Sequence, residues 1–341
     1  MRPILFLTPF ATFTAFFLTT TISLAEQTYD QGPVFSFIEE NDLVVNSDRH
    51  YTQGIKLAYL HSDGFLPFGT SNLNELLPAW GYEKKVAKFG YEIGQNIYTP
   101  SDLDVKNPLL NDRPYAGWLY AGVILQRRGV MFSKTPMLES FQLDFGVIGP
   151  TSLAEDAQEW VHRIRGFDQP RGWRNQLHDE PGIEFKYQRT ARFAWSKLHP
   201  FDVEFLPDAG FSLGNIETTA RVGGELRCGV NLPDGFGVQT IDSLTTASGG
   251  YSVSQTTSPW GFYFYGGSEG KAVLHNAFLD GNLFRSSASV KKEYLVGDLK
   301  AGLVFVLNRI ELGYTFVFRT PEFHGQTASD SFGSLFLKAK F

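Results

Sequence analysis

Alternation of apolar residues with polar or small residues is the feature that most limits what this chain can fold into. The clearest segment is IELGYTFVFR at 310–319, and FQLDFGV at 141–147 and SLFLKAKF at 334–341 follow the same pattern. Successive side chains of a β-strand point to opposite faces, so each segment predicts a strand with one apolar face. Strands that have lipid on one side and a barrel interior on the other alternate in this way over about ten residues.

The same alternation, with clusters of Gly, Pro, Asn and Asp taken as turns, predicts thirteen segments along the chain. They lie near residues 33–41, 50–62, 86–99, 114–127, 137–148, 182–195, 201–213, 217–230, 259–268, 290–299, 300–307, 309–319 and 332–341. Single-chain bacterial barrels have even strand numbers, and EYLVGDLKAGLVFVL at 293–307 is typical of one long strand. We therefore expect twelve strands.

A membrane sheet must close, because an unpaired edge in hydrocarbon leaves backbone groups without hydrogen bonds. The predicted fold class is all-β: a transmembrane antiparallel up-and-down β-barrel. A soluble lipocalin-like or sandwich protein is the alternative. Aromatic residues near strand ends, which suit the interfacial girdles of a membrane barrel, favour the first prediction; they are Trp118, Tyr120, Trp260 and Tyr263.

The first 25 residues have the pattern of a secretory signal peptide. Arg2 precedes an apolar stretch that ends near Ile22, and Ser23-Leu24-Ala25 is a small-x-small cleavage site. An uncleaved anchor helix is the alternative. We expect residues 1–25 to be the signal peptide and residues 26–341 to form a single outer-membrane barrel domain.

The rest of the composition excludes several classes of protein. Beyond the leader no apolar run reaches the 18 to 20 residues of a membrane-spanning helix. The net charge of −6 gives no footprint for nucleic acid. Cys228 is the single cysteine, so we expect no disulfide within the chain and a small buried hydrophobic side chain at that position. The loops at 231–259 and 320–331 are rich in Gly, Ser and Thr, and we expect them to be exposed.

Two segments break the β pattern. SNLNELLPAWG at 71–81 predicts a short helix between strands. TSLAEDAQEWVHRIRG at 151–166 predicts a longer one, because its apolar residues recur at helical spacing and Ser152 with Glu155 matches a capping box. A helix inserted in a barrel loop usually plugs or roofs the lumen, so we expect this one to carry His162 toward the polar interior.

His162 is the best candidate among the seven histidines for a general base. It follows a capped helix start, and Asp168 lies six residues later, where a carboxylate could orient the ring or hold a cation. No G-x-S-x-G elbow and no H-E-x-x-H motif is present. The segment 39–52 supplies hard oxygen ligands that suit calcium, although a solvated barrel rim explains them about as well; they are Glu39, Glu40, Asn41, Asp42, Asp48 and Thr52.

Five blocks of the sequence, in order, resemble the LpxR-type outer-membrane lipid A 3′-O-deacylases. They are ENDLVVNSDRHYTQGIKLAY (40–59), GQNIYTPSDL (94–103), NDRPYAGWLYAGV (111–123), GVIGPTS (146–152) and AQEWVHRIRGFDQPRGWRNQL (157–177). The resemblance implies a twelve-stranded barrel in the bacterial outer membrane that depends on Ca²⁺ and hydrolyses the ester of the 3′ acyloxyacyl chain of lipid A, the lipid anchor of lipopolysaccharide. The terminal Phe341 resembles the signal read by the barrel-insertion machinery, which we expect as a partner.

The resemblance also implies the site residues: His162, Asp168, Asn41, Asp42 and Thr52, with Asp42 and Asp168 as metal ligands. The implied mechanism is attack on the acyl carbonyl by a water that His162 activates, while calcium polarises that carbonyl. The chain departs from the family pattern twice. Asp168 stands where the family carries Glu, and only Lys106 remains of a basic loop expected after YTPS.

Two other functions stay open at this level. Another outer-membrane ester hydrolase, of the phospholipase A type, would need a Ser nucleophile near a His; Ser36 and Ser140 are candidates, and neither is next to a His in sequence. A non-catalytic barrel, either a channel or an adhesin, is the second. A channel would need an open lumen.

Overall fold

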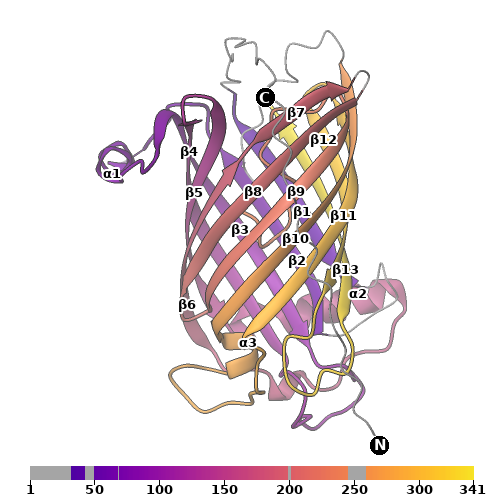
Figure 1. Ribbon diagram of the computed structural model, residues 1–341. Coiled ribbons are helices and arrows are strands. Elements are labelled where there is room, and N and C mark those ends of the chain that lie inside the picture. The colour runs from indigo at the N-terminus through magenta and orange to yellow at the C-terminus, as the bar shows by residue number, and fades with distance from the viewer. Residues whose placement is uncertain (1–31, 43–49, 68, 199–200, 245–258) are drawn as a thin grey trace, which may run out of the picture.

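The computed structural model describes residues 32–42, 50–67, 69–198, 201–244 and 259–341, which form a closed antiparallel barrel (Figure 1). The predicted signal peptide lies outside the described residues. The strands are β1 (Val34–Asn41), β2 (His50–Leu60), β3 (Tyr82–Thr99), β4 (Ala116–Met131), β5 (Thr135–Ile148), β6 (Glu180–Ala191), β7 (Phe193–Leu198), β8 (Phe201–Gly214), β9 (Glu217–Val230), β10 (Trp260–Asn276), β11 (Leu295–Leu307), β12 (Ile310–Arg319) and β13 (Asp330–Lys340).

The barrel has twelve membrane-spanning strands, as predicted. β6 and β7 pair with successive parts of β8, so together they make one strand that is interrupted at Arg192. The segment 293–307 contributes a single strand, β11, as expected. Closure is completed by β1 and β13, where Val34 pairs with Lys340 and Asn41 with Gly333.

The predicted alternation sets which residues face lipid. In β13, Leu335 and Leu337 are exposed on the outside, while Phe336 and Lys338 are buried on the inside. The girdle prediction was wrong for three of its four aromatic residues. Trp118, Tyr120 and Tyr263 are buried within the barrel, and of the four only Trp260 is exposed. Cys228 is also not buried; it is exposed on β9.

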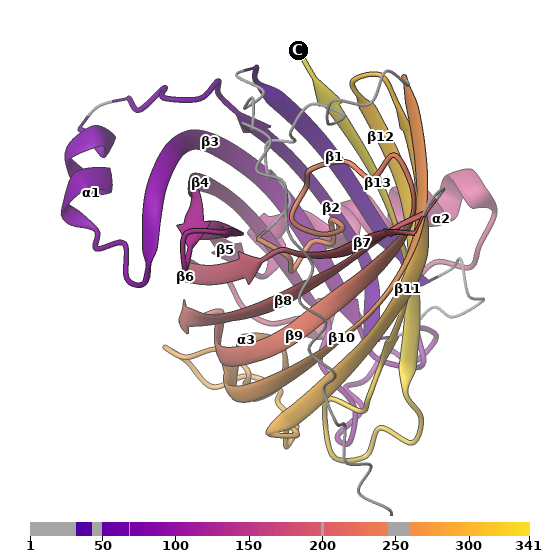
Figure 2. The same ribbon diagram turned by 45° about the horizontal axis from the view of Figure 1, so that its top comes forward.

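Three helices lie at the two ends of the barrel (Figures 1 and 2). α1 (Thr70–Leu76) confirms the predicted short helix and lies at the end where β13 finishes. α2 (Ala154–Arg165) and α3 (Ala277–Asp280) lie at the other end, which we call the long-loop end because the connections 100–115, 149–179 and 277–294 gather there. No helix among the described residues is long and apolar enough to cross a membrane.

The connection between β9 and β10 enters the lumen, contrary to the expectation that it would be exposed. Leu232, Phe236 and Ile241 are buried. The Glu40 carboxylate accepts a hydrogen bond from the Ile241 backbone N–H at 2.8 Å, and the Lys56 ammonium donates to the Ile241 carbonyl at 2.5 Å. We call residues 231–244 the plug, because they fill the interior that the strands enclose.

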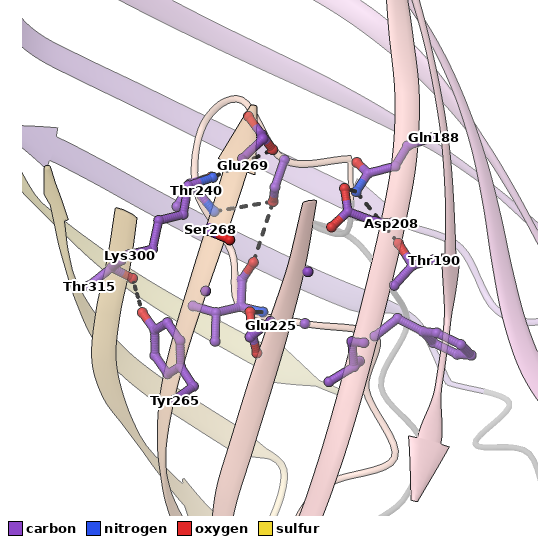
Figure 3. A pocket seen from close by; sticks show the side chains of 17 residues that line it. Gln188, Thr190, Asp208, Glu225, Thr240, Tyr265, Ser268, Glu269, Lys300 and Thr315 are labelled. Atoms are coloured by element: carbon purple, nitrogen blue, oxygen red, sulfur yellow. Dashed lines mark hydrogen bonds and ion pairs between the residues drawn. The ribbon is translucent and has the colours of Figure 1, made fainter. Parts of the chain in front are cut away.

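Charged side chains fill the remainder of the lumen, largely as pairs. Lys271 contacts the plug residue Asp242 at 3.0 Å, and Arg319 contacts Asp298 at 2.8 Å. The space that remains between the plug and β8–β11 is a cavity of about 60 Å³, lined by carboxylates and Lys300 (Figure 3). A water needs about 10–15 Å³ measured in this way, so the cavity has room for only a few waters.

His50 joins three connections at the long-loop end. Its Nδ1 lies 2.8 Å from the Asp330 carboxylate before β12–β13 pairing begins, and its Nε2 lies 3.4 Å from Asp112. Burial alone would raise the pKa of Asp112, but hydrogen bonds from His50 and Ser101 outweigh burial and lower it to about 2. The carboxylate of Asp112 therefore stays charged at neutral pH and helps to fix the loops around the site.

The plug predicts a closed pore. In planar lipid bilayers the wild-type protein is expected to show little or no conductance. A variant that lacks residues 232–244 should conduct, because the deletion removes the buried contents of the lumen and leaves the strands intact. Heat-modifiable migration on gels is the control that the variant still folds as a barrel, and equal conductance of the two proteins would contradict the plug.

Candidate functional site

The segment that leads from β5 into α2 reverses direction through a short series of strained residues. Gly149 has φ +97°, Pro150–Ser152 form a single 3₁₀ turn, and Leu153 is left-handed with φ +59°. The predicted capping box does not form. Ser152 Oγ instead donates back to the Gly149 carbonyl at 2.6 Å, and α2 begins without a side-chain cap. Gly166, also left-handed, ends the helix.

α2 packs against the outside of the barrel wall, so the prediction that it faces the lumen was wrong. The Gln95 side chain donates to the Ser152 carbonyl at 2.6 Å, and Ile97 packs with Ala154. Ser152 and Ala154 also occupy the space where a Cβ on Gly117 would lie, so this position of β4 must be glycine for the helix to approach. The neighbouring residues Asn96 and Trp118 instead line a cavity inside the barrel.

His162 is on the side of α2 that faces the wall. Ala154, Gln158 and His162 recur every four residues and are the buried residues of the helix. His162 Nδ1 lies 2.6 Å from the backbone carbonyl of Asp168, and a carbonyl can only accept, so Nδ1 carries the proton and donates it. In the neutral ring the lone pair is therefore on Nε2.

Asp168 meets His162 through its main chain and not through its carboxylate. Its side chain is exposed in the chain after α2. The ring of Phe167 contacts the imidazole edge to face at 5.8 Å, and the helix C-terminus lies beside it. The sequence pairing of His162 with position 168 is therefore present, but the contact that fixes the ring is a backbone hydrogen bond.

Strand pairing puts Asn41 on the same outer face as the α2 contact. Asn41 pairs with Gln53, Gln53 with Ile97, and Ile97 with Gly117, and directly paired residues share one face of a sheet. We call these four residues the outer row. Glu40 precedes Asn41 on β1 and points the other way, into the lumen, where Tyr51 donates to it at 2.8 Å.

Thr52 lies beside the outer row at a β-bulge. The pairing of β2 with β3 shifts between Tyr51 and Gln53, and Thr52 Oγ1 contacts Thr99 Oγ1 at 2.7 Å. Asn41, Asp42 and Thr52 are each less than 7% exposed. Elsewhere on the outer face of the same strands, Tyr59 and Ile93 are open to lipid, so this part of the outer wall is covered.

The helix and the outer row have matching lengths. Eight residues of helix carry His162 about 12 Å along the axis from Ala154. Three strand spacings, about 14 Å, separate Gly117 from Asn41. α2 starts at β3 and β4, and Figures 1 and 2 show it extending toward the side where β13 lies. We infer that His162 lies over the part of the row that Asn41 and Thr52 occupy.

Oxygen atoms dominate the donor set of this candidate site. Asn41, Asp42 and Thr52 offer amide, carboxylate and hydroxyl oxygens, which suit a hard cation such as Ca²⁺ better than a transition metal. Asp48 lies outside the described residues. Among the residues that the structure does describe, no cluster of three or more His, Cys, Asp or Glu side chains is arranged to hold a metal.

The sequence analysis did not single out the residues that support this arrangement. Thr99 contacts Thr52, and the Trp173 indole donates to Gln158 at 2.8 Å, which ties the chain after α2 to the helix. Each of these residues lies in one of the five sequence blocks quoted above. Their position in those blocks was the available signal, because nothing in their spacing indicates a shared site.

Comparison with solved structures identifies the same fold. LpxR from Salmonella typhimurium matches with a TM-score of 0.70 at 19% identity, over 90% of this chain and 100% of that chain. The β domain of the Bordetella autotransporter BrkA matches with a TM-score of 0.42 at 9% identity, over 92% of this chain and 99% of that one. The translocator domain of the autotransporter NalP from Neisseria meningitidis gives 0.39 at 8% identity, over 92% and 89%. No curated protein sequence matches this chain.

A family comparison covers nearly the whole sequence. The model of the LpxR family, described as outer membrane protein LpxR, matches residues 11–341. That range contains the complete barrel, α2 and the outer row. The protein is thus an integral protein of the bacterial outer membrane. The chain belongs to the LpxR family, a family of outer-membrane lipid A deacylases.

Proposed function

We propose that this protein hydrolyses the ester that attaches the 3′ acyloxyacyl chain to lipid A, using a water that His162 activates. One observation supports this proposal most strongly. The histidine is buried between α2 and the outer wall of the barrel, on the side that lipid reaches, and its Nδ1 is fixed by the Asp168 carbonyl. A lipid substrate can approach such a site sideways from the membrane without entering the lumen.

His162 is suited to the role of general base. Its Nε2 takes a proton from water while the water oxygen attacks the acyl carbonyl carbon. The bond between that carbon and the sugar oxygen then breaks, and the imidazolium returns its proton to the leaving 3′ hydroxyl. The products are a free acyloxyacyl acid and a lipid A that keeps its 3′ hydroxyl, so no covalent acyl-enzyme forms.

Asn41 and Thr52 have polar side chains on the same outer face. They can orient the water and the ester by hydrogen bonds. The contact of Thr52 with Thr99 holds its hydroxyl in place, and the bulge at Tyr51/Gln53 is what lets Thr52 reach that position. β-bulges commonly re-aim a side chain near an active site.

Calcium fits the oxygen-rich character of the site. Asp42 is the main candidate ligand, together with Asn41 and main-chain carbonyls, and the Asp168 carboxylate is a further candidate on the chain after α2. When bound, the ion would supply a Lewis acid that polarises the ester carbonyl. The buried carboxylate of Asp42 is the group whose charge such a cation would balance.

The alternatives fit the structure less well. Ser36 and Ser140, the candidate nucleophiles of a phospholipase A-type enzyme, are buried on lumen-facing positions of β1 and β5. They therefore face away from the lipid and from α2. A channel is disfavoured by the plug, whose buried residues occupy the interior.

Replacing His162 by Ala is expected to abolish 3′ deacylation. Loss of a general base typically slows a reaction about 10²–10⁴-fold. Mass spectrometry of lipid A from cells that express the variant should show no loss of an acyloxyacyl unit, whereas the wild type removes one. His324→Ala is the matched control, since His324 is a half-exposed histidine on another loop of the long-loop end, paired with Glu293. Wild-type levels of deacylation by His162→Ala would disprove the mechanism.

Chelation is expected to inhibit the wild type, and Ca²⁺ should restore activity where Zn²⁺ does not, because the donors are oxygens. Asp42→Asn removes a charge at the candidate ligand, so its Ca²⁺ dissociation constant should rise at least about tenfold on the reasoning that ligand charge sets calcium affinity. Calorimetric titration of the purified proteins with Ca²⁺ measures this directly. Equal calcium affinity of the variant and the wild type would remove Asp42 from the ligand set.

A further inference from the structure

The side of α2 that faces away from the wall, with the chain that follows it, combines exposed apolar and cationic groups. Trp160 is 59% exposed and Ile164 is 64% exposed. They lie two residues before and two residues after His162, so they point to the opposite side of the helix. We call the following set the outer α2 face: Trp160, Ile164, Phe167, Arg163, Arg165 and Arg171.

The apolar part of this face adjoins the lipid-facing wall. α2 covers Ile97 of β3, and Ile93, four residues earlier on the same face of that strand, is 51% exposed to lipid. Four strand residues span about 13 Å. The helix therefore lies at the boundary of the hydrocarbon region, where Trp160 and Ile164 continue the apolar surface of the barrel. Acyl chains of the surrounding leaflet are what can cover them.

The cationic part has no acidic partner within the protein. Arg163, Arg165 and Arg171 are exposed, and none of the three side chains pairs with a carboxylate among the residues that the structure describes. The neighbouring connection 100–115 carries Asp102 and Asp104 on its surface, so it offers little positive charge of its own. Arg163 is three residues from Trp160 and therefore stands beside it on the helix.

A ligand for this face must have both hydrocarbon chains and anionic oxygens. Arginine recognises phosphate through paired N–H donors, and amphipathic helices with basic flanks bind anionic lipid surfaces. We propose that the outer α2 face binds the substrate lipid itself: Arg163, Arg165 and Arg171 take the phosphates of the lipid A headgroup, while Trp160 and Ile164 pack against its acyl chains. This inference rests on the proposed function, since it names the part of lipid A that α2 holds beside His162.

The headgroup and the reacting ester then occupy the same end of α2. His162 is in the last turn of the helix, and Arg163 and Arg165 are its neighbours. A phosphate held there fixes the position of the sugar, and the ester on that sugar is presented to the histidine. Binding energy from the phosphate would thus serve to position the substrate.

The test compares two substrates in mixed micelles: lipid A with its phosphates, and the same lipid A after enzymatic dephosphorylation. In the variant Arg163→Gln/Arg165→Gln/Arg171→Gln, the KM for the phosphorylated substrate should rise about tenfold, the size expected for partly exposed charge-assisted hydrogen bonds. Its kcat, and its KM for the dephosphorylated substrate, should stay near wild-type values. Arg309→Gln is the matched control, an exposed arginine on the turn between β11 and β12 at the opposite end of the barrel, and should change neither.

The apolar part has its own signature. Trp160→Ser/Ile164→Ser should raise KM for both substrates by the same factor, because the acyl chains are common to both. A rise for the phosphorylated substrate alone would contradict the assignment of these residues to acyl chains.

A binding measurement separates the two proposals. Sedimentation of each protein with radiolabelled lipid A micelles reports affinity without turnover. If the wild type binds phosphorylated lipid A more tightly, through the arginines, but releases no acyl chain, the hydrolysis proposal fails and this inference stands. If the wild type deacylates both substrates with equal KM, or the triple-arginine variant keeps the preference for phosphate, this inference fails and the hydrolysis proposal stands.

Discussion

The cost of an unpaired backbone group in hydrocarbon, several kcal/mol each, governs this structure. It requires a sheet without edges, and the pairings of β1 with β13 and of β6 and β7 with β8 remove the last two edges. A closed wall separates two surfaces completely. Any chemistry on a membrane lipid must then take place on the outer surface, because the lipid cannot pass through the sheet to reach the lumen.

The two surfaces of the wall have different contents. Inside, ion pairs such as Arg319 with Asp298, together with the plug, leave a cavity of about 60 Å³, which is far too small for a lipid. Outside, the outer row carries small or polar residues where lipid-facing residues would otherwise stand, and α2 packs over its β3–β4 part. The lumen thus makes the barrel rigid, and the covered outer wall is where a buried histidine and oxygen donors meet the membrane.

Period-two alternation predicted the strands and their number, because lipid enforces it wherever a strand crosses the bilayer. It failed where other chain segments replace lipid or water. Trp118 points inward because buried aromatic and aliphatic residues inside the barrel, such as Tyr120 and Ile216, offer it apolar partners. The side of the wall that α2 takes could not be predicted, since helical spacing gives a buried face without saying which surface buries it. The same limit applies to the plug, whose Gly-rich sequence is typical of an exposed loop.

The position of α2 outside the barrel is the central claim, and nitroxide accessibility measures it most directly. A spin label at position 160, in a Cys228→Ser background reconstituted in bilayers, reports collisions with lipid-soluble oxygen and with a water-soluble nickel chelate. A label at the lipid-facing position 123 of β4 is the reference. The structure predicts that oxygen relaxes the label at 160 more strongly than nickel does, as at 123. A label at 160 that responds mainly to nickel, as expected for a helix that roofs the aqueous lumen, would contradict it.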